Sequence, residues 1–130
     1  MPRMRTVDTD DVLSWVAAYE MAWRAADLSA VERLFTADAR YRFAPYEEPR
    51  IGHDAIRAAW VDDELTFSFT VEPVAVQGQT AVVRLEVRYG DPVHQEYRDL
   101  WILRFAADGR VQEFEEWAYW PGKPYTAESP

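Results

Sequence analysis

Residues 80–89 read TAVVRLEVRY, a stretch in which apolar and charged side chains alternate from position 83 onward. Successive side chains of a β-strand point to opposite faces of the sheet, so this period of two predicts a strand with one buried and one exposed face. Arg84, Glu86 and Arg88 are expected on the exposed face, as a solvated or dimer-facing surface. A slip of one residue would instead turn them into the interior, where they would bind an anion.

Strand patterns continue on both sides of this stretch. Gly78 marks the turn from a preceding strand, in which Pro73 predicts a bulge or an edge position. Asp108-Gly109 is a hairpin signal between the last two strands. Short turns thus join four antiparallel strands, which are predicted over residues 66–76, 80–89, 95–105 and 111–120, and residues 121–130 are expected to form a tail.

The N-terminal half has helical periodicity instead. Apolar side chains recur at spacings of three and four from Val12 to Ala26, and Asp8 or Thr9 can cap this helix. Three further elements are predicted, namely a short helix opened by a capping box at 29–32, a strand at 39–43 and a helix from Gly52 onward.

This order of elements predicts an α+β fold, with three N-terminal helices packed against one face of a curved antiparallel sheet. The 130 residues are expected to form a single domain. A strongly curved sheet closed by a long helix makes a cone that encloses a pocket. The 6 Trp, 7 Tyr and 6 Phe make up 15% of the chain, and so many rings favour an aromatic-lined pocket over a featureless core.

Composition excludes several classes of function. The chain has 23 acidic and 14 basic side chains and a net charge of −9, so nucleic acid and anionic membranes are not expected as partners because both would repel it. It has no cysteine and only two histidines, so we predict neither a metal site nor a cofactor. The N-terminus lacks a signal peptide and no apolar run could span a membrane, so a cytoplasmic protein is expected.

Five short segments carry a resemblance to a known family. They are YEMAWRAADL at 19–28, LFTADA at 34–39, GHDAI at 52–56, LRFAADGRV at 103–111 and FEEW at 114–117. In order and spacing they resemble the SnoaL-like branch of the nuclear transport factor 2-like superfamily, from about Val12 to Trp120. That superfamily includes isomerases, cyclases, dehydratases, epoxide hydrolases, non-catalytic binders and transport adaptors, so the resemblance implies a fold and not one activity.

The resemblance also implies roles for single positions. In a ketosteroid isomerase-like alignment, Tyr19 falls on the tyrosine of the first helix that polarises the substrate oxygen. The catalytic carboxylate falls on Phe43 and the buried acid that assists the tyrosine falls on Trp101, so steroid isomerase chemistry is not expected. The Arg-x-Asp pair of epoxide hydrolase relatives is also not reproduced, because Arg98 and Asp99 are adjacent and point to opposite faces.

Two carboxylates are the candidate catalytic residues. The same alignment directs Asp99, Trp101, Phe114 and Glu116 toward the pocket, whereas a register shift of one residue would place Glu115 there. If Asp99 and Glu116 face one apolar pocket, burial and mutual repulsion should raise a pKa and prepare a general acid or base. In the alternative, one or both lie in solvent or pair with an arginine, the candidates being Arg84, Arg88 and Arg98.

Tyr19 is the third candidate catalytic residue. It lies on the inner stripe of the first helix and either donates to a substrate oxygen, donates to Glu116, or is a core tyrosine. His53 is expected at the surface, His94 near the pocket mouth and the Glu47-Glu48 pair in a solvated loop. Nine aromatic side chains are predicted to bind the ligand or, alternatively, to form plain core: Trp23, Phe35, Tyr41, Phe43, Trp60, Phe67, Phe69, Trp101 and Phe114.

These residues leave two main functions open. One is a cofactor-independent enzyme of the isomerase, cyclase, dehydratase or hydrolase type, which uses acid–base chemistry on a small apolar or aromatic substrate. The other is a non-catalytic domain that binds a small molecule or a partner protein. A third hypothesis is a purely structural oligomerisation module, for which Leu100, Ile102 and Trp120 could supply a dimer face across the sheet. A homodimer is expected.

Overall fold

The computed structural model describes residues 6–60 and 67–122. Within them lie α1 (Thr9–Arg24), the 3₁₀ turn η1 (Leu28–Ala30), α2 (Val31–Leu34), α3 (His53–Ala59) and strands β1 (Phe35–Arg42), β2 (Arg50–Ile51), β3 (Phe67–Gln77), β4 (Thr80–Tyr89), β5 (Gln95–Phe105) and β6 (Val111–Tyr119). The sequence-predicted bounds of β4 and β5 agree with these. The predicted tail beyond residue 122, and Thr66, lie outside the described residues.

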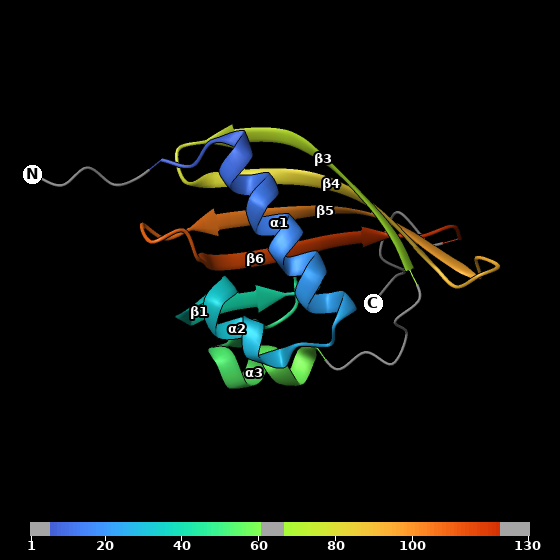
Figure 1. The fold of residues 1–130 in the computed structure, drawn as a ribbon, viewed down its shortest axis with the longest axis horizontal. Helices are drawn as coiled ribbons and strands as arrows, with labels where there is room; N and C mark the ends of the chain where they lie inside the picture. Colours follow the sequence, from blue (N-terminus) through green and yellow to red (C-terminus); the bar gives the residue numbers. More distant parts are fainter. Residues whose placement is uncertain (1–5, 61–66, 123–130) are drawn as a thin grey trace, which may run out of the picture.

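The strands form one open sheet in the order β2-β1-β6-β5-β4-β3. Figure 1 shows α1 lying across one face of this sheet, while α2 and α3 pack near β1. The fold is therefore α+β, with helices on one face, as the sequence predicts. The face that carries α1 holds the core.

The sheet is mixed and not wholly antiparallel, which corrects the sequence-based expectation. Strands β3 to β6 form an antiparallel meander, but β1 pairs parallel to β6. A short hairpin turn enforces antiparallel pairing, whereas β1 and β6 are separated by most of the chain and no turn constrains their direction. The two-residue strand β2, for which the sequence analysis makes no prediction, pairs with β1 on its other edge.

Helix α1 begins at a reciprocal cap. The Asp8 side chain accepts from the backbone N–H of Asp11, and the Asp11 side chain accepts from the N–H of Asp8. The predicted apolar stripe is the buried face, and Trp15 at its centre donates through Nε1 to the Leu34 carbonyl at 3.0 Å. The stripe also directs Tyr19 toward the sheet.

The capping box predicted at residues 29–32 does not form. Asp27 caps η1 instead, because its carboxylate accepts from both the backbone N–H and the hydroxyl of Ser29. Since the Ser29 hydroxyl is used in this way, α2 follows directly from Ala30 without a side-chain cap. Strand β1 then begins at Phe35, four residues earlier than predicted.

The register of the long strands assigns every side chain to a face. Val83, Leu85 and Val87 are buried against α1, so Arg84 lies on the outer face and the slipped register with inward arginines is wrong. A register shift between Pro73 and Ala75 confirms the predicted irregularity in β3.

The hairpin of β5 and β6 resolves the remaining ambiguity. Trp101 pairs with Glu116 and Leu103 pairs with Phe114, so Glu116 shares the inner face with two buried residues. Glu115 pairs with Ile102 on the outer face.

Candidate functional site

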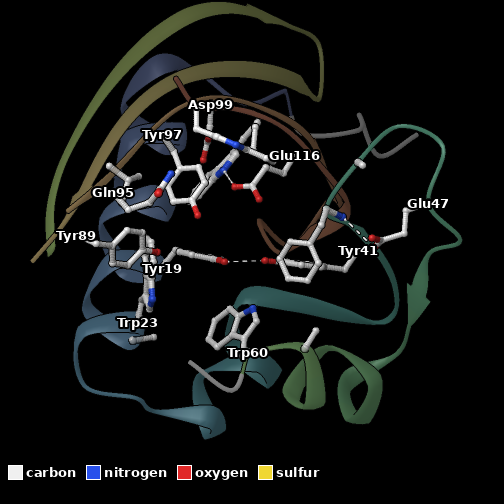
Figure 2. A pocket seen from close by; sticks show the side chains of 18 of the residues that line it. Tyr19, Trp23, Tyr41, Glu47, Trp60, Tyr89, Gln95, Tyr97, Asp99 and Glu116 are labelled. Atoms are coloured by element: carbon white, nitrogen blue, oxygen red, sulfur yellow. Dashed lines mark hydrogen bonds between the residues drawn. The ribbon is translucent and has the colours of Figure 1, made fainter. Parts of the chain in front are cut away.

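A pocket of about 670 Å³ lies between α1, β1, α3 and the inner face of strands β4 to β6. This volume falls within the range of about 300–1,000 Å³ that is typical of small-molecule sites. Figure 2 shows polar groups from β5 and β6 facing the side chains of α1 and β1 across the pocket. The lining residues are Tyr19, Ala22, Trp23, Ala26, Leu28, Tyr41, Phe43, Ala44, Glu47, Ala59, Trp60, Val87, Tyr89, His94, Gln95, Tyr97, Asp99, Trp101, Glu116, Ala118 and Trp120.

Asp99 on β5 and Glu116 on β6 form a carboxyl pair in this pocket. Asp99 is opposite Ala118 and Glu116 is opposite Trp101, so the two carboxyls are diagonal neighbours on one face of the hairpin. The two carboxyls are close enough for Asp99 to influence the pKa of Glu116 as a hydrogen-bonding neighbour. Trp101 Nε1 donates a hydrogen bond to Glu116 Oε2 at 2.9 Å.

The surroundings of Glu116 raise its pKa. Burial disfavours the charged form most strongly, and the negative charge of Glu47 acts in the same direction. The hydrogen bonds with Asp99 and Trp101 lower the pKa, but they do not offset the cost of desolvation. The predicted alternative, a solvated Glu116, is therefore wrong. The three candidate arginine partners form ion pairs with outer-face glutamates instead: Arg84 with Glu72, Arg88 with Glu86 and Glu96, and Arg98 with Glu86.

Two tyrosine hydroxyls form a second polar group opposite the carboxyls. Tyr19 Oη and Tyr41 Oη lie 2.8 Å apart, and both side chains are buried. Burial is the main cause that raises the pKa of Tyr19 and of Tyr41 well above the usual value, and the charge of Glu116 contributes to both. Both hydroxyls therefore stay protonated at neutral pH and can act as hydrogen-bond donors. The partner of Tyr19 is Tyr41 and not Glu116, which was one of the predicted alternatives.

Trp60 adds a third donor near the hydroxyl pair. Its indole nitrogen is buried and lies close enough to Tyr41 to lower the pKa of that hydroxyl. Among the described residues, however, no acceptor forms a hydrogen bond with this nitrogen. Figure 2 shows this nitrogen directed toward the Tyr19–Tyr41 pair. A buried N–H without an acceptor is unfavourable, so an oxygen atom of a ligand would find a donor here.

Aromatic rings surround these groups in two levels. Tyr41 and Trp101 are each only 2% exposed and form the inner wall. Nearer the solvent, Tyr89 and Tyr97 have ring centroids 5.8 Å apart, and Tyr97 and Trp120 have ring centroids 5.7 Å apart. We call Tyr89, Tyr97 and Trp120 the rim arc. Trp120 is 40% exposed, so the rim arc lies where the pocket meets solvent.

The nine predicted ligand-binding aromatics divide into two groups. Trp23, Tyr41, Phe43, Trp60 and Trp101 line the pocket, together with the three candidate catalytic residues. The other four belong to the core behind the wall: Phe35 and Phe114 are fully buried, and Phe67 and Phe69 pack against Trp23.

Sequence reasoning missed Glu47, which it placed in a solvated loop. Glu47 lines the pocket, accepts a hydrogen bond from the Phe43 backbone at 3.2 Å and forms an ion pair with Arg50. The guanidinium of Arg50 also lies 4.7 Å from the centre of the Phe43 ring. Arg50, which makes both contacts, belongs to the short strand β2. No periodic pattern in the sequence predicts this strand or the contacts.

Two rim residues carried a signal that the sequence analysis did not use. Tyr97 has the same strand parity as Asp99 and Trp101, and Trp120 has the same parity as Glu116. Trp120 therefore lines the pocket, which corrects its assignment to the outer face. His94 also lines the pocket, near the predicted mouth.

His53 is the other correction. It was expected at the surface, but it is half-buried, and its Nε2 lies 2.9 Å from the Phe35 carbonyl, to which it can donate.

Within residues 6–60 and 67–122, no three histidine or carboxylate side chains gather in a way that would hold a metal ion. Among the same residues, no helix has the length and hydropathy needed to cross a membrane.

Comparison with known proteins places the fold in context. The sequence profile of the SnoaL-like domain matches residues 15–114. Comparison with curated proteins gives no match.

Solved structures resemble the chain over most of its length. A protein assigned as a ketosteroid isomerase from Kribbella flavida is 18% identical, with a TM-score of 0.67 over 94% of this chain and 86% of its own. One assigned as a SnoaL-like polyketide cyclase from Jannaschia is 16% identical, with a TM-score of 0.70 over 91% of each chain. SalBIII, an epoxide hydrolase/cyclase-like enzyme in pyran ring formation of salinomycin, is 18% identical, with a TM-score of 0.61 over 88% of this chain and 94% of its own. At these identities the likeness shows the fold alone.

Proposed function

Because the chain belongs to the SnoaL-like domain family, we propose that it binds a small apolar or aromatic molecule and adds or removes a proton on that molecule without a cofactor. Solved structures with this fold include proteins assigned as an isomerase and as a cyclase. The single observation that carries this proposal is the composition of the pocket. The neighbouring carboxyls of Asp99 and Glu116 lie in the same aromatic-lined pocket as the hydrogen-bonded hydroxyls of Tyr19 and Tyr41.

The carboxyl pair supplies the acid–base chemistry. The raised pKa of Glu116 brings it closer to neutral pH, where a side chain both accepts and returns protons effectively. Trp101 fixes the orientation of Glu116 through the bond from Nε1.

The hydroxyl pair and Trp60 supply the complementary electrostatics. When a proton leaves a carbon next to a carbonyl, negative charge develops on the carbonyl oxygen. Donors that already point to that position stabilise the charge without reorganisation. Within the Tyr19–Tyr41 pair one hydroxyl donates to the other, so the pair offers one free O–H to a substrate oxygen, and the N–H of Trp60 offers another donor. Burial of the two tyrosines strengthens these hydrogen bonds.

A non-catalytic binding domain is the second candidate. It is favoured by Phe43, which occupies the position where the resemblance implies the isomerase carboxylate. Phe43 is covered by the guanidinium of Arg50, so this part of the wall has no free carboxylate to act as a base.

Exchange of substrate protons with solvent separates the two candidates. Ring-bearing ketones would first be screened for binding by thermal shift, and the binders incubated with the protein in deuterated water. We expect exchange at the carbon next to the carbonyl, observed by NMR. The variants Glu116→Gln and Asp99→Asn should bind the ketone but slow the exchange by about 10²–10⁴-fold.

Glu115→Gln is the matched control, because it removes the adjacent carboxylate on the outer face. It should exchange at the wild-type rate. Ketone binding without exchange in the wild type would instead support the non-catalytic domain.

A further inference from the structure

The charges that line the pocket are of one sign. Asp99, Glu116 and Glu47 contribute carboxyls, and no lysine or arginine is among the described residues that line it. The guanidinium of Arg50 is paired with Glu47 of the lining and lies over the Phe43 ring. The one remaining basic group of the lining is the imidazole of His94. The pocket is therefore unsuited to a carboxylate or phosphate ligand.

The rim arc lies directly beside the carboxyl pair. Tyr97 and Asp99 are two residues apart on the inner face of β5, and Trp120 follows two residues after Ala118, the partner of Asp99. The ring centroids of Tyr97 and Trp120 are 5.7 Å apart at an interplanar angle of 77°, so the two rings meet as a corner and not as a stack. Figure 2 shows Tyr97 and Asp99 on the same side of the pocket.

Aromatic ring faces and a neighbouring carboxylate both attract cations. The face of a tyrosine or tryptophan ring carries negative electrostatic potential and attracts cations, most strongly where water is partly excluded. A carboxylate next to such faces adds a direct ion pair for a group that has left water. A neutral or anionic group gains neither interaction.

From this geometry we infer that the substrate is an organic amine whose ammonium group lies against the rim arc beside Asp99, with its apolar ring extending toward Trp60 and Trp101. This inference rests on the proposed function, because it assigns a substrate class to the same pocket. It also separates the two carboxyls by task. Asp99 neutralises the ammonium group, while Glu116, which is held by the indole N–H of Trp101, transfers the proton.

Three probes with one ring system test the inference: naphthylmethylamine, naphthylmethanol and naphthoate, titrated into the full chain by calorimetry at neutral pH. We expect the ammonium probe to bind about tenfold or more tightly than the alcohol, which corresponds to about 1.4 kcal/mol. Naphthoate should bind more weakly than the alcohol, because its charge meets the carboxyls.

Two variants identify the residues responsible. Asp99→Asn should reduce the preference for the ammonium probe, measured as the ratio of its affinity to that of the alcohol, to about twofold or less. Trp120→Leu should weaken ammonium binding in the same direction. Because Trp120 is 40% exposed, this variant keeps the test valid if Asp99→Asn fails to fold. Glu115→Gln, the outer-face control, should keep the wild-type preference.

The possible outcomes distinguish the amine assignment from the proposed function on which it rests. If the wild type binds the alcohol and the ammonium probe equally, the amine assignment is overturned and the apolar pocket stands. If both variants keep the full preference, the place assigned to the ammonium group is wrong. If none of the three probes binds, both the amine assignment and the proposed ligand class fail.

Discussion

At the scale of single residues, Glu115 and Glu116 are adjacent carboxylates in opposite environments. Glu115 lies on the outer face and accepts a hydrogen bond from Trp117 Nε1 at 2.7 Å. Glu116 lies on the inner face and accepts from Trp101 Nε1 at 2.9 Å. Each therefore has an indole partner, and burial raises the pKa of Glu116. The pair is a natural comparison for the effect of burial.

The raised pKa of Glu116 predicts how stability depends on pH. Between the ordinary glutamate pKa, about 4.3, and the raised value, the folded protein binds a proton that the unfolded chain has lost. The contribution of Glu116 to stability is thus fully present below the ordinary value and is lost as pH rises through the raised value. We expect a fall of at most about 1.4 kcal/mol per pH unit from this group.

Urea unfolding at a series of pH values from acid to neutral measures this contribution. The free energy of unfolding of Glu116→Gln should fall less steeply with pH than that of the wild type across this window. Glu115→Gln, which removes the adjacent carboxylate on the outer face, is the control variant. Parallel curves for the wild type and Glu116→Gln would show that burial does not raise the pKa of Glu116.

How far single residues could be predicted depends on whether they lie in a periodic element. The family resemblance directed Asp99 and Glu116 to the pocket, and strand parity would have added Tyr97, which lies two residues before Asp99. The choice between Glu115 and Glu116 needed the hairpin register, which a one-residue shift at the turn would have reversed. Glu47 lies in an irregular segment, where no repeat relates sequence position to direction.

At the scale of elements, α1 positions Tyr19 and Trp23 in the pocket, so its N-terminal cap supports the site from a distance. Asp8 accepts from the backbone N–H of Asp11 at 2.8 Å. We predict that Asp8→Ala lowers the free energy of unfolding by about 1 kcal/mol, because a backbone donor of the first turn loses its acceptor.

The matched control for the cap is Asp10→Ala. Asp10 lies in the same first turn but does not form the cap, so this change should lower stability by only a few tenths of a kcal/mol, about the value of a charge near a helix N-terminus. Both variants would be measured by urea unfolding at neutral pH. Equal effects would contradict the role of the Asp8 side chain.

The predictability of the elements follows their length and their periodicity. Strands β4 and β5, at 10 and 11 residues with clean alternation, have the predicted bounds. The short N-terminal elements differ more, because η1 depends on the Asp27–Ser29 contact and β2 has only two residues. The parallel partner of β1 is set by packing between distant parts of the chain, which no local pattern encodes.

At the scale of the whole molecule, the sheet has two unlike faces. The inner face carries the core and the pocket, whereas the outer face mixes ion pairs with apolar side chains. Leu100 pairs with Trp117 across β5 and β6, and Ile102 and Tyr119 lie on the same face. Trp117 and Tyr119 remain 37% and 40% exposed. Exposed aromatic rings that adjoin apolar neighbours are typical of an interaction surface.

We propose that this outer face joins two copies of the chain. Leu100 and Trp117 are directly opposite each other in the middle of the hairpin, so they would lie near the axis of a symmetric dimer. Light scattering at micromolar concentration should give a mass of twice the 15.1 kDa of one chain. Leu100→Glu together with Trp117→Glu should give the monomer mass, because like charges would face each other across the axis.

Met21→Glu is the matched control for this dimer, because Met21 is a 73% exposed apolar residue on α1, away from the outer face. It should leave the mass at the dimer value. The pocket opens on the other face of the sheet, so the monomeric variant should also retain the binding of naphthylmethanol. A wild-type mass of one chain at micromolar concentration would overturn the dimer. Loss of alcohol binding in the folded monomer would instead show that the two faces are coupled.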